Sequence, residues 1–382
     1  ASDQFQIAGG WGGGTFVGSV GVTLNNLSIK NFFKKGAWRP YPMGQNQRLS
    51  ISAQTNGTYY KAFAISFTDP WMGGRKPNSF TISAHYSDEN NAYYAWQKGT
   101  RYFRTAGVAA GLGKRLDWPD PYFTFYAEAS YERYMLKDWN TFVLKNGAAN
   151  LLSIRLVLGR NSVDQPIYPR RGSDFSVSVQ LTPPYSLWDG KDYKSTALSE
   201  QERYNWIEFH KWMLKGQWFT PLTRNGNLVL MARAEMGYLG HYNKNKVSPF
   251  ERFEVGGDGM TGYNMYGIDI ISMRGYDDGA LDPVGSNYSC AYNKYTMELR
   301  YPLLLKGQTN IYVLGFLEGG NGFTSWKEFS PFKIKRSAGI GVRLFLPVVG
   351  MVGVDWGWGF DPAAGQTKRS GSHIHFTMGM QF

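Results

Sequence analysis

The last ten residues, HIHFTMGMQF (residues 373–382), alternate apolar and polar side chains and end on an aromatic residue. One face of this segment carries Ile374, Phe376, Met378, Met380 and Phe382, and the other carries His373, His375, Thr377, Gly379 and Gln381. A strand of this kind is typical of the closing strand of a bacterial outer-membrane β-barrel. In a soluble protein it would be an apolar edge that invites aggregation, so the segment favours a membrane barrel.

Two further segments repeat the same alternation, YTMELRYP (residues 295–302) and MVGVDWGWGF (residues 351–360). In the first, Met297, Leu299 and Tyr301 lie on one face and Glu298 and Arg300 on the other. In a soluble sandwich the apolar face would form the core, whereas in a membrane barrel it would contact lipid. The alternation alone does not separate these two folds.

Composition narrows the classes of protein that are possible. No stretch of 18 or more residues is dominantly apolar, which argues against a helical membrane protein, but strands of a membrane barrel escape that test. The net charge is +12, yet Lys and Arg are scattered through the chain rather than clustered, so we expect no nucleic-acid partner. The single cysteine, Cys290, excludes an internal disulfide and a cysteine-rich metal site.

The connections between the expected strands differ in length. Residues 117–121 and 346–350 are short and rich in Pro or Gly, whereas residues 183–204 and 240–290 form long connections. Short turns at one end and long loops at the other are typical of an outer-membrane barrel. Asn56-Gly57 predicts a tight hairpin, and residues 195–204 are the best helical candidate, within a loop. About sixteen strands of roughly ten residues would use this length, so we predict one all-β, transmembrane antiparallel β-barrel domain over residues 1–382.

Several motifs, in order, resemble one family. They are QIAGGWGGGTFVGSVGVTLNNLSIKNFF (6–33), SPFERFEVGGDGMTGY (248–263), SMRGYDD (272–278), TMELRYPLLL (296–305), YVLGFLEGGNGF (312–323), SAGIGVRLFLPVVGMVGVDWGWGF (337–360) and HFTMGMQF (375–382). Together they resemble the barrel domain of the BamA family of outer-membrane β-barrel assembly factors. The resemblance covers nearly the whole chain and is clearest after Tyr204. One departure is Glu318, where the family usually carries Asp.

The resemblance implies that the long loop before Cys290 is extracellular and folds back into the barrel lumen. Its Arg-Gly-aromatic tripeptide is Arg274, Gly275 and Tyr276, and the implied partners of Arg274 on the inner wall are Glu298 and Glu318. A guanidinium between two carboxylates can form bidentate, charge-assisted bonds that Lys does not copy. The implied role is structural, because the contact would pin the loop and stiffen one side of the barrel.

A closed barrel must pair its first strand with its last. The predicted seam joins Gln6, Ile7, Ala8, Gly9 and Gly10 of the first strand to Phe376, Thr377, Met378, Gly379, Met380, Gln381 and Phe382 of the last. Glycine weakens strand interiors, but it also permits bulges and barrel curvature, and the residues alone leave both explanations open. The resemblance implies a marginal seam that opens sideways.

The resemblance also implies the function. The protein would be the central subunit of the machine that folds and inserts β-barrel proteins into the bacterial cell outer membrane. Its implied partners are client barrel proteins, accessory lipoproteins or periplasmic subunits, and outer-membrane lipid and lipopolysaccharide, and periplasmic POTRA repeats are expected upstream of the barrel. The alternatives are a TamA-like or two-partner secretion translocation factor and, from another class, a passive porin.

Motifs for covalent chemistry are weak or missing. There is no G-x-S-x-G elbow and no Walker A pattern, and GDGMTG (residues 257–262) matches G-x-G-x-x-G without the βαβ context that a dinucleotide site needs. His373 and His375 share a face and could hold a metal, although lumen-facing polar residues explain them more simply. We therefore expect no enzyme activity, no catalytic residue, no metal and no cofactor.

Overall fold

The computed structural model describes residues 4–12, 15–38, 40–56, 59–74, 77–92, 99–259, 267–285, 288–306, 309–346 and 350–378. Contacts between residues divide the chain into two compact units. Unit 1 comprises Ala1–Val157, Gln180–His210 and His241–Pro249, and unit 2 comprises Leu158–Val179, Lys211–Gly240 and Phe250–Phe382.

The regular secondary structure of the described chain is almost entirely β-strand, as the sequence predicts. The first seven strands are β1 (Gln4–Gly12), β2 (Thr15–Leu27), β3 (Gln47–Asn56), β4 (Tyr60–Asp69), β5 (Asn78–Asn90), β6 (Tyr102–Arg115) and β7 (Phe123–Lys137). Next come β8 (Gly147–Asn161), β9 (Gly172–Leu181), β10 (His210–Pro221) and β11 (Val229–Gly240). The last five are β14 (Ala291–Lys306), β15 (Thr309–Phe323), β16 (Lys335–Leu346), β17 (Gly350–Pro362) and β18 (Arg369–Met378).

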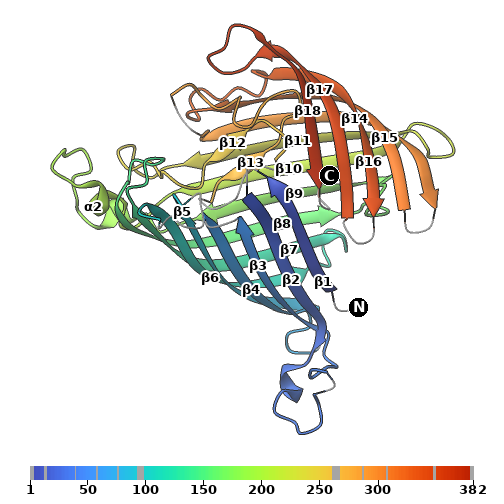
Figure 1. Cartoon of the computed structure of the whole chain (residues 1–382), viewed down its shortest axis with the longest axis horizontal. Helices are drawn as coiled ribbons and strands as arrows, with labels where there is room; N and C mark the ends of the chain where they lie inside the picture. Colours follow the sequence, from blue (N-terminus) through green and yellow to red (C-terminus); the bar gives the residue numbers. More distant parts are fainter. Residues whose placement is uncertain are drawn as a thin grey trace. The chain divides into compact units, whose positions relative to one another are not determined.

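These strands pair in chain order. Over the described residues they form one 16-stranded sheet, in which β14 follows β11. Neighbours such as β14 and β15, or β2 and β3, run antiparallel. Figure 1 shows β14 to β18 side by side, in orange to red. The strand number and the antiparallel pairing agree with the prediction of about sixteen antiparallel strands.

Helices in the described part of the chain are few and short. They are η1 (Ile29–Asn31), α1 (Tyr185–Trp188) and α2 (Glu200–Tyr204). The helix predicted within residues 195–204 is present, because Ser199 and Glu202 form a reciprocal capping box at its start. In the part of the chain that the structure describes, no helix is both long and apolar enough to cross a membrane. The predicted Asn56-Gly57 turn includes residues 57 and 58, which lie outside the described residues.

The long connection from β11 to β14 contains more structure than its sequence suggests. Two short strands, β12 (Phe253–Val255) and β13 (Asp269–Ile271), pair in parallel there. Phe253 also exchanges two backbone hydrogen bonds with Ser289, at 2.9 and 2.7 Å. The part of the connection that belongs to unit 2, from Phe250 onward, therefore contains paired strands, whereas the sequence pattern predicted a loop without strands.

The alternation on β14 decides between the two folds left open by the sequence. Met297, Leu299 and Tyr301 are 49%, 47% and 47% exposed, whereas Glu298 and Arg300 are 5% and 2% exposed. A soluble sandwich would bury its apolar face, and this strand does the opposite. The same arrangement continues on the neighbouring strands. Their exposed apolar residues include Leu317, Ile340, Val342, Val354, Trp356, Ile374 and Phe376.

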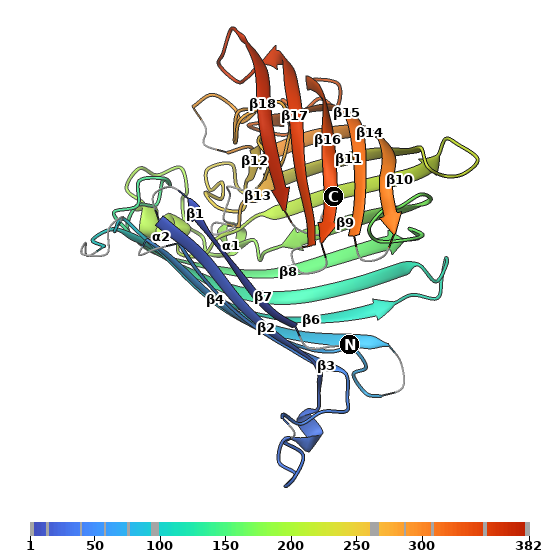
Figure 2. The same ribbon diagram turned by 45° about the vertical axis from the view of Figure 1, so that its right-hand side comes forward.

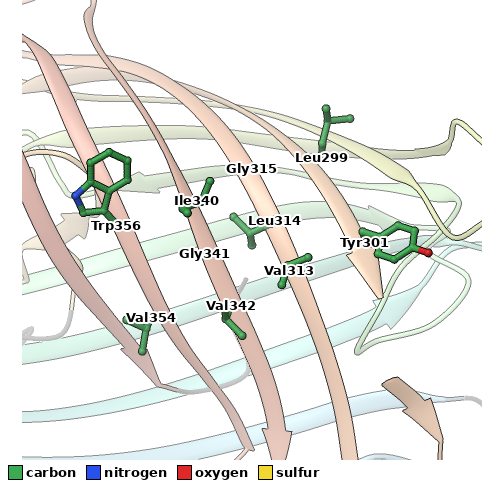
Figure 3. A pocket seen from close by; sticks show the side chains of 10 residues that line it. All are labelled: Leu299, Tyr301, Val313, Leu314, Gly315, Ile340, Gly341, Val342, Val354 and Trp356. Carbon is green, nitrogen blue, oxygen red and sulfur yellow. The ribbon is translucent and has the colours of Figure 1, made fainter. Parts of the chain in front are cut away.

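The exposed apolar face of β14 to β17 contains a groove of about 530 Å³ (Figure 3). Its floor lies at Gly315, which pairs in register with Leu299 on one side and Ile340 on the other. Tyr301 and Trp356 stand at opposite ends of the groove in Figure 3. An outward face this continuously apolar is what strands in contact with lipid show.

On the other face of strands β14 to β18, apolar and charged side chains lie next to each other. An apolar cluster includes Tyr168, Tyr312, Phe316 and Met351. The Tyr168 hydroxyl donates to the carbonyl oxygens of Asn227 and Arg300 at 2.8 and 2.9 Å, although one proton serves only one of them at a time. A buried hydroxyl needs such acceptors. Beside this cluster lie charged side chains, and these form the candidate site.

Candidate functional site

The site is built where the β11–β14 connection lies against the polar face of β14 to β18. Met273, Arg274 and Tyr276 are buried there. Met273 donates its backbone N–H to the carbonyl of Gly257 at 2.9 Å, and Gly257 donates back to the carbonyl of Tyr276 at 3.2 Å. These two backbone hydrogen bonds hold residues 273–276 against Gly257, within the β11–β14 connection itself.

The structure brings Arg274 together with both of its predicted partners. Its Nη2 lies 2.6 Å from Glu318 Oε1 and 2.7 Å from Glu298 Oε1. Its backbone N–H also donates to Glu318 Oε2 at 2.9 Å. Glu318 therefore receives the side chain and the main chain of the same residue. Because the carboxylates stand on β15 and β14, one arginine links the loop to two adjacent strands.

The charges around Arg274 alternate in sign. Glu298 also accepts from Arg300 Nε at 2.8 Å, and Asp355 accepts from Arg343 through two nitrogens at 2.8 and 2.7 Å. Burial lowers the pKa of the Arg274 guanidinium, but Glu318, Glu298 and Asp355 outweigh burial and raise it above its ordinary value. Arg274 is thus held as a cation. Buried charges are tolerated when they are paired in this way.

The guanidinium of Arg274 also stacks. Its central carbon lies 3.7 Å from the centroid of the Phe316 ring, on the strand that carries Glu318. A delocalised planar cation over an aromatic face gains cation–π energy while its edges remain free for carboxylates. A small polar cavity of about 100 Å³ lies beside Arg274, and its lining includes Glu298, Glu318, Arg343 and Asp355.

Gly275 is required by geometry. Its φ is +86°, which favours glycine, and a Cβ there would lie 2.8 Å from Ser337 Cβ and 3.0 Å from the backbone nitrogen of Gly359. Gly357 makes the matching room, since a Cβ on it would lie 2.8 Å from the Gly275 nitrogen. Gly275 N–H donates to His375 Nε2 at 2.8 Å, so the loop contacts β18 directly.

Tyr276 completes the contact with the sheet. Its ring is fully buried, and its hydroxyl donates to the carbonyl of Arg336 on β16 at 2.8 Å. Burial raises the pKa of this hydroxyl to about 12, so it remains a donor. The tripeptide therefore contacts β14, β15, β16, β17 and β18, and it braces five neighbouring strands of unit 2.

A second ion cluster, missed by the sequence reasoning, ties down the base of the loop. Lys211 Nζ on β10 lies 2.6 Å from Asp269 Oδ2 and 3.2 Å from Glu251 Oε2, and it donates to the Gly267 carbonyl at 3.3 Å. Glu251 has a φ of +64°, which is rare for a side chain of its kind. No periodic signal in the sequence joins these positions.

Asp282 is a further buried group in the same connection. Its Oδ1 accepts from Ser289 Oγ at 2.5 Å and from the Val255 N–H at 3.2 Å, and over the described residues its Oδ2 has no hydrogen-bond partner. Burial raises the pKa of Asp282 to about 8. At neutral pH the Asp282 carboxyl is therefore protonated, so the oxygen without a partner carries no buried charge.

In unit 1, a buried ion pair joins the β9–β10 connection to the first residues of the β11–β14 connection. Lys246 Nζ lies 3.4 Å from Glu208 Oε2 and 3.3 Å from the hydroxyl of Tyr193, and both ionic side chains are buried. Burial lowers the pKa of Lys246, and Glu208 opposes that shift. Glu208 also accepts from the backbone N–H and the hydroxyl of Ser186. This cluster joins the β9–β10 connection to the start of the β11–β14 connection.

The predicted seam residues are placed only in part. Gln6, Ile7, Ala8, Gly9 and Gly10 lie on β1, which pairs with β2 from Gln4↔Thr23 to Gly12↔Thr15. Phe376, Thr377 and Met378 lie on β18, and Gly379, Met380, Gln381 and Phe382 lie outside the described residues. Pairing across the seam, closure of the sheet and a lumen around the loop stay predictions.

His373 and His375 have partners of other kinds. His373 Nδ1 lies 3.2 Å from Asp277 Oδ1, and His375 accepts from Gly275. Among the described residues no group of three or more His, Cys, Asp or Glu side chains could hold a metal ion. Paired buried charges and hydrogen bonds thus hold the loop against the strands.

An antiparallel sheet with one exposed apolar face, buried charges on its other face and a long loop held against those charges is typical of a membrane β-barrel protein. The chain belongs to the Omp85 superfamily, whose domain profile matches residues 43–382. It is therefore an outer-membrane protein that crosses the bilayer repeatedly with β-strands.

Named relatives are consistent with that family. Outer membrane protein assembly factor BamA of Neisseria meningitidis serogroup B (strain ATCC BAA-335 / MC58) is 22% identical over 322 residues, which are 79% of this chain and 33% of the relative. The chain thus spans about a third of the length of this curated relative.

Two solved structures share the fold. The crystal structure of BamA from Haemophilus ducreyi lacking POTRA domains 1–3 has a TM-score of 0.66 at 16% identity, over 98% of this chain and 68% of that one. CdiB from Escherichia coli has a TM-score of 0.56 at 12% identity, over 98% and 67%.

Proposed function

We propose that this chain is the membrane domain of an assembly factor that folds and inserts β-barrel proteins into the outer membrane. The observation that carries the proposal is a contrast between two regions of the sheet. The loop braces β14 to β18 through Arg274, Gly275 and Tyr276, whereas β1 carries glycine at residues 9, 10 and 12. Glycine weakens a strand ladder, so the free edge of β1 is the place where the wall should open.

The proposed mechanism uses backbone hydrogen bonds alone. An opened β1 presents unpaired N–H and C=O groups, to which an incoming strand adds by β-augmentation. Main-chain bonds carry no sequence code, so one edge serves many clients. A short final strand would also thin the apolar band beside it and disturb nearby lipid. The proposal needs no covalent step, no nucleotide and no cofactor, and the protein would not be an enzyme.

The proposed partners follow from this role. They are client β-barrel proteins, accessory assembly lipoproteins or periplasmic subunits, and the lipid and lipopolysaccharide of the outer membrane. The relative that supports them is the BamA assembly factor of Neisseria meningitidis, which matches most of this chain.

A translocation factor, TamA-like or of two-partner secretion, is the second candidate. The likeness of fold to CdiB favours it, although with a lower TM-score than the BamA structure has. Depletion separates the two candidates, because loss of an assembly factor lowers the whole β-barrel content of the outer membrane, whereas loss of a secretion factor spares it. A passive porin would instead show large, steady conductance in planar bilayers.

The direct test is a disulfide between the first and last strands. Cysteines at Ala8 and Thr377, which lie on the same face of their strands, would lock the seam under oxidation in a chain with Cys290→Ala. The control lock joins Ala8 to Ser19, which are register partners in the β1–β2 pair and leave the seam untouched. We expect the seam lock to stop client insertion until a reductant is added, and the control to insert normally. Full insertion by the locked seam would refute the proposal.

A further inference from the structure

The connection between β2 and β3, residues 28–46, differs from the other connections at its end of the sheet. In an antiparallel sheet, connections β2–β3, β4–β5 and β6–β7 leave from the same end, and the latter two span only residues 70–77 and 116–122. Figure 2 shows the β2–β3 connection, with η1, extending away from the ends of its strands. Short connections mark the periplasmic side of an outer-membrane barrel.

This connection is held in one conformation at its base. Ser28 is fully buried, donates its N–H to the Pro42 carbonyl at 2.9 Å and donates its hydroxyl to Gln45 Oε1 at 3.0 Å. Asn26 Oδ1 accepts from the N–H groups of Gly44 and Asn46 at 3.2 and 3.1 Å. These hydrogen bonds tie the two ends of the connection, residues 26–28 and 42–46, to each other.

The part beyond the base is aromatic and exposed. Phe32 contacts Phe33 and Trp38 edge to face, with ring centroids 5.3 and 5.0 Å apart. Phe33 is 92% exposed and Trp38 is 53% exposed. The indole N–H of Trp38 donates to the Phe32 carbonyl at 3.0 Å, so its polar group is satisfied within the connection. Apolar edges are left facing outward.

The charges of this connection have a single sign. Its charged residues at neutral pH are Lys30, Lys34, Lys35 and Arg39, and the sequence places no Asp or Glu between residues 28 and 46. The three lysines are exposed. A surface with only cations and exposed aromatic rings matches an anionic, partly apolar partner.

We propose that residues 28–46 form an anchor on the periplasmic surface of the bilayer, which binds anionic phospholipid headgroups through lysine and inserts Phe33 and Trp38 at their level. Aromatic residues prefer the membrane–water interface, and each basic residue near an anionic surface adds attraction that salt screens. The anchor lies where strands β2 and β3 leave the membrane, next to β1. The inference rests on the outer-membrane location and not on the proposed insertion activity.

Spin-label depth measurements test the anchor on the whole chain. One label is placed through Phe33→Cys and another through Lys35→Cys, which keeps every aromatic ring, in a Cys290→Ala background. The matched control is Asp117→Cys, an exposed polar position on the short β6–β7 connection of the same unit. The chain is folded into vesicles of phosphatidylethanolamine with phosphatidylglycerol, or of phosphatidylcholine alone.

In the anionic vesicles we expect oxygen to reach the residue 33 label several-fold more readily than a water-soluble nickel chelate does. The label at residue 35 should lie at headgroup depth, and the label at 117 should favour the chelate. A variant with Lys30→Gln and Lys34→Gln, high salt, or neutral vesicles should move the label at 33 toward water. Chelate access at 33 equal to that at 117, as a protein-binding surface would give, overturns the proposal, and so does a depth that ignores lysine removal and salt.

Discussion

Replacing Arg274 with alanine should lower the free energy of unfolding of unit 2. The size of the loss depends on how well Glu298 and Glu318 remain paired with other cations. The change removes two side-chain contacts of Glu318, at 2.6 and 3.1 Å, and one of Glu298, at 2.7 Å. The backbone N–H of residue 274 still donates to Glu318. Glu298 keeps Arg300 at 2.7 Å, whereas the nearest other cation to Glu318 is Lys294 at 4.0 Å. The stranded charge is therefore mainly Glu318.

Removing one partner of a buried ion pair costs on the order of 3–5 kcal/mol. Because Glu298 remains paired, we expect Arg274→Ala to fall at the lower end, about 3 kcal/mol. Arg274→Lys keeps a charge but loses the second hydrogen bond of the guanidinium and its stacking on Phe316. It should cost about 1.5–3 kcal/mol, the worth of one hydrogen bond to a charged group. Arg274→Ala with Glu318→Gln should be more stable than Arg274→Ala alone, because no charge is then stranded.

Reversible urea unfolding in lipid vesicles, followed by tryptophan fluorescence, measures these differences. The control is Arg336→Ala, since the Arg336 side chain is 65% exposed beside Asp361, and an exposed pair contributes little. The backbone carbonyl of Arg336 still accepts from Tyr276 in that variant. If Arg274→Ala unfolds at the same urea concentration as the unmodified chain, or if Glu318→Gln makes it worse, the charge-stranding argument fails.

Three further changes test other groups. Folded Asp282 keeps its proton up to about pH 8, so the free energy of unfolding should fall as the pH rises from the ordinary pKa of an aspartate to about 8. Asp282→Asn keeps an oxygen that accepts both hydrogen bonds of Oδ1, and urea unfolding at pH 5 and pH 9 should no longer show that fall. Lys246→Met strands Glu208 and should speed protease cleavage of the β9–β10 connection by at least about tenfold, whereas Lys246→Arg should not. His375→Leu leaves the Gly275 N–H without its acceptor and should cost about 1–3 kcal/mol in urea unfolding, while His373→Leu should cost less.

The fold could be predicted because strand alternation is a local signal. Met297, Leu299 and Tyr301 are exposed and Glu298 is buried, as a period of two requires. The helix at Glu200–Tyr204 was also predictable, since its capping box lies within four residues of sequence. Arg274 and its two acids were named from family resemblance, and the structure brings their side chains within hydrogen-bonding distance.

The contacts that sequence reasoning missed join residues far apart in the chain. Lys211 meets Glu251 and Asp269 across more than one connection, and Lys246 meets Glu208 across β10 and β11. Neither pair has a spacing that recurs, so no local pattern selects it. The parallel β12–β13 pair was missed for a related reason, because three residues are too few to show a period.

The loop does not hold all five strands equally, and this bears on where the sheet can move. The ionic contacts of Arg274 fall on β14, β15 and β17, while β18 is joined to the tripeptide by one hydrogen bond from Gly275 to His375. Breaking the ion cluster costs on the order of 3–5 kcal/mol, whereas a single hydrogen bond has a net worth of about 0.5–1.5 kcal/mol. Releasing the tripeptide from β18 therefore needs less free energy than releasing it from β14 or β15. The loop also meets β18 through Asp277, 3.2 Å from His373, and through Asp258, which accepts from the Phe376 N–H at 3.4 Å. If His375→Leu speeds client insertion while Arg274→Ala slows it, the loop acts as a brace for the inner strands and only a light latch on the last one. If both changes slow insertion alike, β18 and its neighbours move as one body and the opening edge must be β1 alone.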